Sequence, residues 1–135
     1  TYQAQEVPLL RFAEAYLLRA EALNELDQPA LALADVDVIR ARSNASLLVG
    51  TTSDKVDVRS IILAERAMEF AQEFNRKFDL LRWGLYLKVM NKTVNVPTKY
   101  GSTISKIREP RSVLYAVPTT EINGNKLFGP NNPGW

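Results

Sequence analysis

The chain of 135 residues contains no cysteine and no histidine. Without cysteine there is no disulfide, no thiolate metal ligand and no thiol nucleophile. Without histidine the chain lacks the side chain that proteins use most often as a general base and as a metal ligand. We therefore expect no metal, no cofactor and no catalytic residue, and the sequence argues against an enzyme.

Long apolar runs are also missing. No run approaches the ~20 residues that a helix needs to cross a bilayer. The first residues, TYQAQEVP, contain neither an initiator Met nor a signal peptide. We expect this start to be an artificial start or the boundary of a fragment.

Neither sign of charge is in excess, because 17 Lys and Arg face 15 Asp and Glu, a net charge of +2. This balance gives no electrostatic reason to expect nucleic acid or an anionic membrane surface as a partner. With 46% hydrophobic and 24% charged residues, the composition is that of a folded chain, and its length suffices for one core. We expect residues 1–135 to form a single domain.

Apolar residues recur at helical spacing in two stretches near the start of the chain. The first predicted helix spans residues 9–26, with Pro8 in its first turn, and the second spans residues 30–42, after a break that ends with Pro29. The residues expected to point inward are Leu10, Ala13, Leu17 and Ala20, then Leu31, Ala34, Val38 and Ala41. The short connection forces an antiparallel pair, and residues 9–42 resemble one tetratricopeptide unit.

The remainder divides into a third helical region and a tail. Asp54 is a good N-cap for a helix that starts at Lys55, and residues 54–90 are predicted to be a long helix, a bend or stop near Asn75, and a continuation. Residues 91–135 are rich in turn residues and predict loops and an irregular tail, with a short extended segment at 113–117 and anchors at Ile122, Leu127, Phe128 and Trp135. The predicted fold class is mainly α, a tetratricopeptide-like helical scaffold with long loops and an irregular C-terminal tail.

Charged residues crowd the apolar ones between Ile61 and Gly84. They are Glu65, Arg66, Glu69, Glu73, Arg76, Asp79 and Arg82. On a continuous helix, four pairs of opposite sign would be neighbours at a spacing of three. Because aromatic residues lie among them, we expect some of these charges to be buried and paired with other helices, as a structural ion-pair motif.

A catalytic interpretation of the same charges is weaker. Paired carboxylates hydrolyse glycosides, but one carboxyl must then have a raised pKa and face a cleft. Here each acid has an arginine nearby that would hold it ionised. We expect Arg76→Ala to lower stability and not to remove an activity.

Aromatic side chains offer a weak signal for sugar binding, because flat rings with a polar edge stack on sugars. Trp83 and Tyr115 lie in apolar sequence and are expected to be core. Tyr100, beside Gly101 in a polar loop, is the candidate for an exposed ligand-binding residue.

Three stretches, in order, carry a family resemblance. The first is VPLLRFAEAYLLRAEALNEL followed by DVIRAR (Asp37–Arg42), and the second is AERAMEFAQEFNRKFDLLRWG, with an ER–EF–E–R–DL–RWG pattern. The third is LYAVPTTEI (Leu114–Ile122) with the ending NNPGW. Together they resemble the C-terminal region of the SusD/RagB-like outer-membrane nutrient-binding lipoproteins.

The resemblance implies a fold, a function and a location. The chain would be the C-terminal part of a longer SusD-like protein that faces outward on the outer membrane. That protein would bind oligosaccharide or glycan nutrients without chemistry, for import through a TonB-dependent, SusC-like transporter. Its sugar would bind mostly outside this segment, and its membrane anchor would be an N-terminal lipid on a cysteine that this chain does not contain.

One position departs from the family pattern. Family members often have glycine directly after the acid that matches Glu73, where this chain has Phe74. Phenylalanine disfavours the left-handed backbone that glycine allows. We therefore expect the bend to move to Asn75 or to be absent.

A second function class fits the helical pair alone. A freestanding tetratricopeptide-type module would bind a protein or peptide partner in its concave groove. Further repeats of about 34 residues upstream would favour that alternative. The ER–EF–DL–RWG stretch combined with NNPGW favours the nutrient-binding family.

Overall fold

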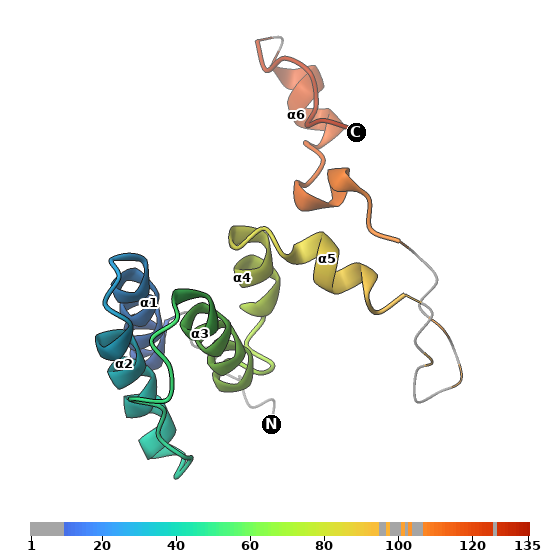
Figure 1. The fold of residues 1–135 in the computed structure, drawn as a ribbon. Coiled ribbons are helices and arrows are strands. Elements are labelled where there is room, and N and C mark those ends of the chain that lie inside the picture. The colour runs from blue at the N-terminus through green and yellow to red at the C-terminus, as the bar shows by residue number, and fades with distance from the viewer. Residues whose placement is uncertain (1–9, 95–96, 98–100, 102, 104–106, 126) are drawn as a thin grey trace, which may run out of the picture. The chain divides into compact units, whose positions relative to one another are not determined.

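The computed structural model describes residues 10–94, 97, 101, 103, 107–125 and 127–135 (Figure 1). The regular elements of these residues are helices, with one isolated antiparallel bridge between Pro97 and Thr103. The prediction of a mainly α fold is therefore confirmed. The chain divides into two compact units, residues 1–76 and 77–135, and each is described by itself. The prediction of a single domain stays a prediction.

The first unit starts with an antiparallel helix pair, α1 (Phe12–Glu25) and α2 (Pro29–Arg42). The turn between them uses Asp27 in the left-handed region, with φ of 59°, a conformation that a short polar side chain tolerates. Pro29 occupies the first turn of α2, where its missing N–H costs nothing. The predicted tetratricopeptide-like pair is thus present.

The start of α1 differs from the prediction. Helix α1 begins at Phe12, with Arg11 as its N-cap residue in an extended conformation, and Leu10 is exposed. Pro8, which was expected in the first turn, lies outside the described residues. The other three residues expected to point inward, Ala13, Leu17 and Ala20, are buried.

The predicted inward face of α2 is wrong. Leu31, Ala34, Val38 and Ala41 are exposed, and the buried apolar residues are Ala32, Leu33, Val36 and Ile39. Apolar residues surround this helix on all sides, so their spacing does not select one face. Asp35 and Asp37 are buried as well, because each has a hydrogen-bonding partner.

Helix α3 (Lys55–Glu69) lies beside both α1 and α2 and completes the core of the first unit (Figure 1). Asp54 caps it as predicted, because its carboxylate accepts the backbone N–H groups of Val56 and Asp57 at 2.8 and 2.9 Å. Side chains from all three helices are fully buried where they meet, namely Leu17, Ala20, Leu33, Val36, Val58 and Ile62.

The helical run breaks after Glu69, close to the bend or stop predicted near Asn75. The residues that form the break are unexpected. Phe74 itself adopts the left-handed conformation, with φ of 64°, and Gln72 does so as well, with φ of 69°. The expectation that Phe74 would move the bend to Asn75 or remove it is therefore wrong. Phe74 is exposed, so no core packing opposes this backbone conformation.

The second unit consists of short helices. Helix α4 (Arg76–Arg82) begins at the boundary between the units, and Gly84, with φ of 68°, separates it from α5 (Tyr86–Asn91). A 3-10 turn, η1 (Pro110–Val113), and helix α6 (Thr119–Gly124) follow in the tail. No described helix is long and apolar enough to cross a membrane.

The tail is more regular than predicted and differently anchored. An extended segment was predicted at residues 113–117. In the structure Val113 is the last residue of η1, and the extended or irregular segment starts only after it. Leu127, an expected anchor, is 95% exposed, and Phe128 and Trp135 are about half exposed. None of the described residues at 107–125 and 127–135 is buried, and hydrogen bonds link these two stretches.

The burial of α2 gives a direct test with two leucines that lie two residues apart. Leu33→Ala is expected to lower the free energy of unfolding by about 2–5 kcal/mol, because it leaves a cavity among three helices. Leu31→Ala is expected to change it by less than about 0.5 kcal/mol, because Leu31 is exposed. Urea unfolding of both variants measures the difference. A larger loss for Leu31→Ala would show that the other face of α2 is the buried one.

Candidate functional site

The end of α3 is the point where charges from all three long helices meet. The Glu69 carboxylate accepts a hydrogen bond from Arg11, which precedes α1, at 2.8 Å, and two from Arg42, which ends α2, at 2.6 and 2.7 Å. Arg11 also donates to the backbone carbonyl of Glu69 at 2.9 Å. A carboxylate is disfavoured at a helix C-terminus, where the dipole is negative, and the two arginines offset that cost.

Phe70, directly after α3, is packed between two guanidinium groups. The guanidinium carbons of Arg11 and Arg66 each lie 5.1 Å from the centroid of its ring. The ring itself is buried. Such cation–π contacts are worth ~0.5–2 kcal/mol, with the larger values where water is excluded. The aromatic ring therefore stabilises the same arginines that bind the acids.

Two further pairs join α3 to the other helices. Glu65 accepts from Arg40 of α2 at 2.8 Å, and both side chains are largely buried. Arg66, whose side chain is 2% exposed, lies 3.4 Å from the Glu14 carboxylate of α1. Removing one member of a buried pair costs about 3–5 kcal/mol, because it leaves the other charge buried and uncompensated.

The break after α3 separates residues that would be neighbours on a continuous helix. Glu73 pairs with Arg11 at 2.8 Å. Arg76 donates to the backbone carbonyl of Leu63 at 3.1 Å. The predicted spacing of three is found at Asp79 and Arg82 in the second unit, which lie 3.4 Å apart. The seven residues of the predicted motif are therefore divided between the two units.

The electrostatics of Glu69 favour a structural role. Burial alone would raise the pKa of this carboxyl, but hydrogen bonds and charge interactions from Arg42 and Arg11 outweigh burial and lower it below its ordinary value. A general acid needs the opposite displacement. The Glu69 carboxyl is thus held ionised and bonded to arginine.

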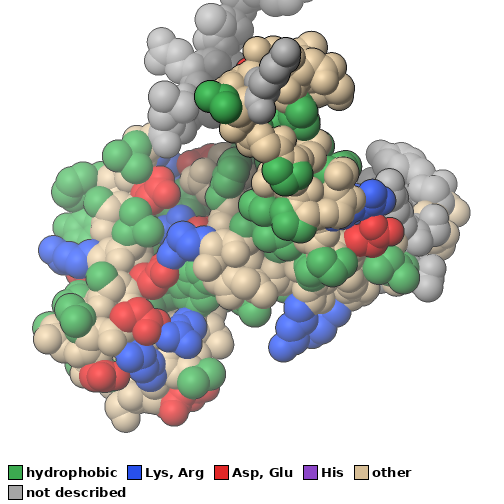
Figure 2. Space-filling view, turned by 90° about the horizontal axis from the view of Figure 1, so that it is seen from above, with side chains coloured by type: hydrophobic (Ala, Val, Ile, Leu, Met, Phe, Trp, Pro, Cys, Tyr) green, Lys and Arg blue, Asp and Glu red, His purple; other side chains and the backbone are tan. Residues whose placement is uncertain are grey.

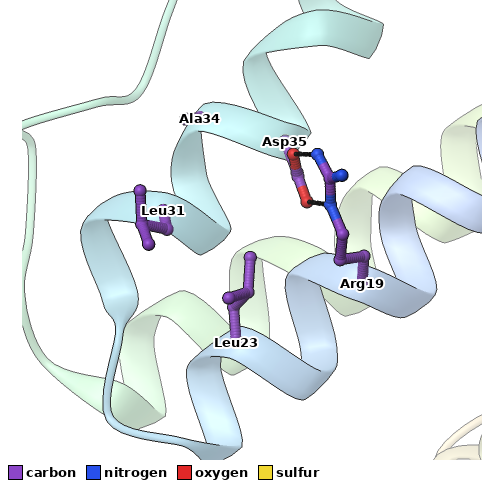
Figure 3. A pocket seen from close by; sticks show the side chains of 5 residues that line it. All are labelled: Arg19, Leu23, Leu31, Ala34 and Asp35. Atoms are coloured by element: carbon purple, nitrogen blue, oxygen red, sulfur yellow. Dashed lines mark hydrogen bonds and ion pairs between the residues drawn. The ribbon is translucent and has the colours of Figure 1, made fainter.

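Two buried aspartates of α2 bind neighbouring segments of the first unit. Arg19 of α1 donates through two nitrogens to the two carboxylate oxygens of Asp35, at 2.6 and 2.5 Å (Figure 3). Asp37 accepts the backbone N–H groups of Leu48 and Val49 at 2.7 and 2.9 Å and fixes the loop between α2 and α3.

Beside the Arg19–Asp35 pair lies a hollow of about 430 Å³, lined also by Leu23, Leu31 and Ala34 (Figure 3).

Positive and negative side chains lie next to one another on the face seen in Figure 2, among hydrophobic ones. The described side chains drawn in that view form no large patch of one sign. Among the residues that the structure describes, no three His, Cys, Asp or Glu side chains are grouped closely enough to hold a metal ion.

The structure describes two of the three aromatic candidates. Tyr100, the proposed exposed ligand-binding residue, lies outside the described residues. Trp83 was expected to be core, and it is only partly buried. Tyr115 was expected to be core, and that expectation is wrong, because it is 68% exposed. The Lys77 ammonium lies 4.1 Å from the Tyr115 ring centroid and donates to its hydroxyl.

The sequence pointed to the acids of α3 but not to their partners. Arg11, Arg40 and Arg42 lie 25 to 62 residues away along the chain from the acids they bind. Helical spacing cannot reveal pairs at such separations. The signal for them lay in two family-like stretches. VPLLRFAEAYLLRAEALNEL contains Arg11, and DVIRAR contains Arg40, Arg42 and the buried Asp37.

The fold and the network together define a class, a tetratricopeptide-like helical scaffold joined by buried ion pairs. Comparison with known proteins identifies the family within this class. The model of the SusD family matches residues 1–135. The chain therefore belongs to the SusD family.

Relatives in this family are much longer than the chain. The starch-binding protein SusD of Bacteroides thetaiotaomicron is 31% identical over 134 residues, which are 97% of this chain and 22% of that protein. SusD-like protein P25 of Formosa agariphila is 32% identical over 122 residues, or 89% and 22%. A crystal structure of a SusD-like protein from Bacteroides fragilis matches with a TM-score of 0.73 and 34% identity, over 93% of this chain and 25% of that one. The chain spans about a quarter of these proteins.

The lowered pKa of Glu69 gives a pH-dependent test. Glu69→Gln is expected to lower stability by about 1–3 kcal/mol at pH 7, because charge-assisted bonds to two arginines become neutral ones. The ionised carboxylate stabilises the folded state fully above its unfolded pKa of about 4.3. Its contribution is lost as the pH falls through the lower folded value, so the difference between parent and variant narrows in acid.

Urea unfolding at neutral and acid pH measures this difference, with Glu121→Gln as the control at an exposed carboxylate. The control is expected to match the parent at both pH values. A gap for Glu69→Gln that is independent of pH would contradict the assignment of Glu69 as an ionised partner.

Proposed function

We propose that this chain is the scaffold segment of a non-catalytic protein that binds oligosaccharide or glycan nutrients at the cell surface. The observation that carries the proposal is the SusD family match over all 135 residues. The relative named as a starch-binding protein makes a polysaccharide the natural ligand class. The seven-residue motif is proposed to be structural, and Tyr100 remains the candidate for a sugar contact within the segment.

The geometry supports a scaffold and not a catalytic centre. Glu65 and Glu69 of α3 are bonded to arginines, and the Glu69 carboxyl has a lowered pKa. A glycosidase of the usual two-carboxylate kind needs a protonated acid beside a second free carboxylate. The proposed protein therefore binds its glycan and leaves it intact.

We propose further that the segment is the C-terminal part of a longer SusD-like protein on the outer membrane. The relatives are about four times as long as this chain or more. The outer face of α2 exposes Leu31 and Val38, apolar surface that an adjacent helix of a longer protein would bury. The alternative of a freestanding tetratricopeptide module is not favoured, because the family match covers the whole chain.

Affinity electrophoresis tests ligand binding. The protein encoded by the complete gene is run through native gels that contain starch or, in parallel, other soluble polysaccharides. It is expected to be retarded by at least one of them, and the polysaccharide is expected to gain no reducing ends. Serum albumin is the control for retardation by viscosity. Equal mobility in every gel, or release of reducing sugar, would refute the proposal.

The proposed partner is a TonB-dependent, SusC-like transporter in the same membrane. Affinity capture of the complete protein from detergent-solubilised outer membranes is expected to yield that transporter in near-equal amounts, identified by mass spectrometry. A strain without the transporter gene provides the matched control. Capture of the protein at full yield but without the transporter, from solubilised membranes of the parent strain, would contradict this partner.

A further inference from the structure

The ending NNPGW has no role in the scaffold or in the proposed ligand binding, yet the structure places it in a specific set of contacts. Residues 131–135 fold back on the segment from Pro110 to Pro118 in the second unit. All contacts between these two segments lie within the second unit.

Asn131 pairs with the backbone of Val117 in both directions. Its side-chain oxygen accepts the Val117 N–H at 2.8 Å, and its side-chain nitrogen donates to the Val117 carbonyl at 3.2 Å. Asn132 adds a bond from its side-chain nitrogen to the carbonyl of Tyr115 at 2.7 Å. Residues 115–117 are not part of a strand, so side-chain amides supply partners that a neighbouring strand would supply in a sheet.

Trp135 closes the other end of the same segment. Its indole N–H is shared between the carbonyls of Arg111 and Leu114, each at 3.2 Å, and these carbonyls belong to η1 and to the residue after it. The Arg111 guanidinium carbon lies 5.2 Å from the centroid of the indole ring. Arg111 also donates to the carbonyl of Gly134 at 3.3 Å.

Gly134 is required for this approach. Its φ is 89°, and a β-carbon built on it would lie 2.8 Å from the β-carbon of Arg111. Real β-carbons do not approach other atoms so closely. Gly129, in the same tail, has a similar φ of 81°, but a β-carbon there would meet nothing within 4 Å.

We propose that residues 131–135 act as a clasp that closes the tail into a self-contained loop and holds residues 111–117 in one conformation. The two asparagine amides bind the extended residues, the indole binds the 3-10 turn, and Gly134 lets the two backbones meet. Because the contacts share Arg111 and the segment it begins, the clasp opens and closes as one unit. Its closure fixes the position at which the exposed Tyr115 ring is presented.

Two glycine variants separate the clasp from ordinary backbone strain. Gly134→Ala and Gly129→Ala place the same methyl group at similar positive φ, so the intrinsic strain is matched, and only Gly134→Ala collides with Arg111. The readout is native-state hydrogen exchange of the Val117 amide, which donates to Asn131, and of the Leu114 amide, which donates to Arg111. Amides of α2 in the same sample provide an internal reference.

Gly134→Ala is expected to speed exchange of both amides on the order of tenfold, since bonds worth about a kcal/mol each are lost together. Gly129→Ala is expected to stay within about twofold of the parent, and α2 amides are expected to be unchanged in both. Equal exchange at Val117 in the two variants, whether fast or slow, would overturn the proposal. So would an effect of Gly134→Ala on Leu114 alone, because the clasp would then not act as a unit.

Discussion

The bonding of Glu69 to two arginines is the interaction on which the first unit depends. Arg11 precedes α1 and Arg42 ends α2, so a single carboxylate at the end of α3 receives hydrogen bonds from both other helices. Phe70, the next residue, is packed against Arg11 and Arg66. Apolar packing of Leu17, Leu33 and Ile62 supplies most of the burial, but apolar contact is not directional. The charged contacts specify how the three helices align.

This arrangement has a consequence for function. Charges that are bonded to partners within the fold are not free to bind or transform a ligand. Glu65 and Glu69 of α3, and Glu73 after it, are bonded to arginines in this way. The contacts explain why several stretches of the chain can share a family pattern without forming a catalytic site. The pattern in this segment therefore fits a scaffold, and under the proposed function the ligand would be bound mostly by other parts of a longer protein.

Elements with strong local signals were predictable from the sequence, and contacts between distant residues were not. The α1–α2 pair, Pro29, and the Asp54 cap follow from spacing and capping chemistry within a few residues. The buried face of α2 could not be chosen, because apolar residues surround the helix and the buried Asp35 depends on Arg19 in another helix. Phe74 shows a related limit, because local propensity opposes its backbone conformation and the fold still adopts it.

Contacts between distant residues also determine the candidate site. Seven charged residues were identified from their density among aromatics, but only Asp79 and Arg82 pair at the predicted spacing. The partners of Glu65, Glu69 and Glu73 lie on or beside other helices, where spacing along the chain does not reveal them. Tyr115 was assigned to the core from its apolar neighbours, whereas hydrogen bonds from Asn132 and Trp135 hold its segment at the surface. Apolar sequence in the tail therefore does not indicate burial.

The most direct test of the central claim is a double-mutant cycle between Arg11 and Glu69, measured by urea unfolding of Arg11→Ala, Glu69→Ala and the double variant. The account predicts a coupling free energy of about 1–3 kcal/mol, because the two residues share one bonded contact between α1 and α3. Single effects that add to within about 0.5 kcal/mol would contradict it. In that case apolar packing alone would align the helices.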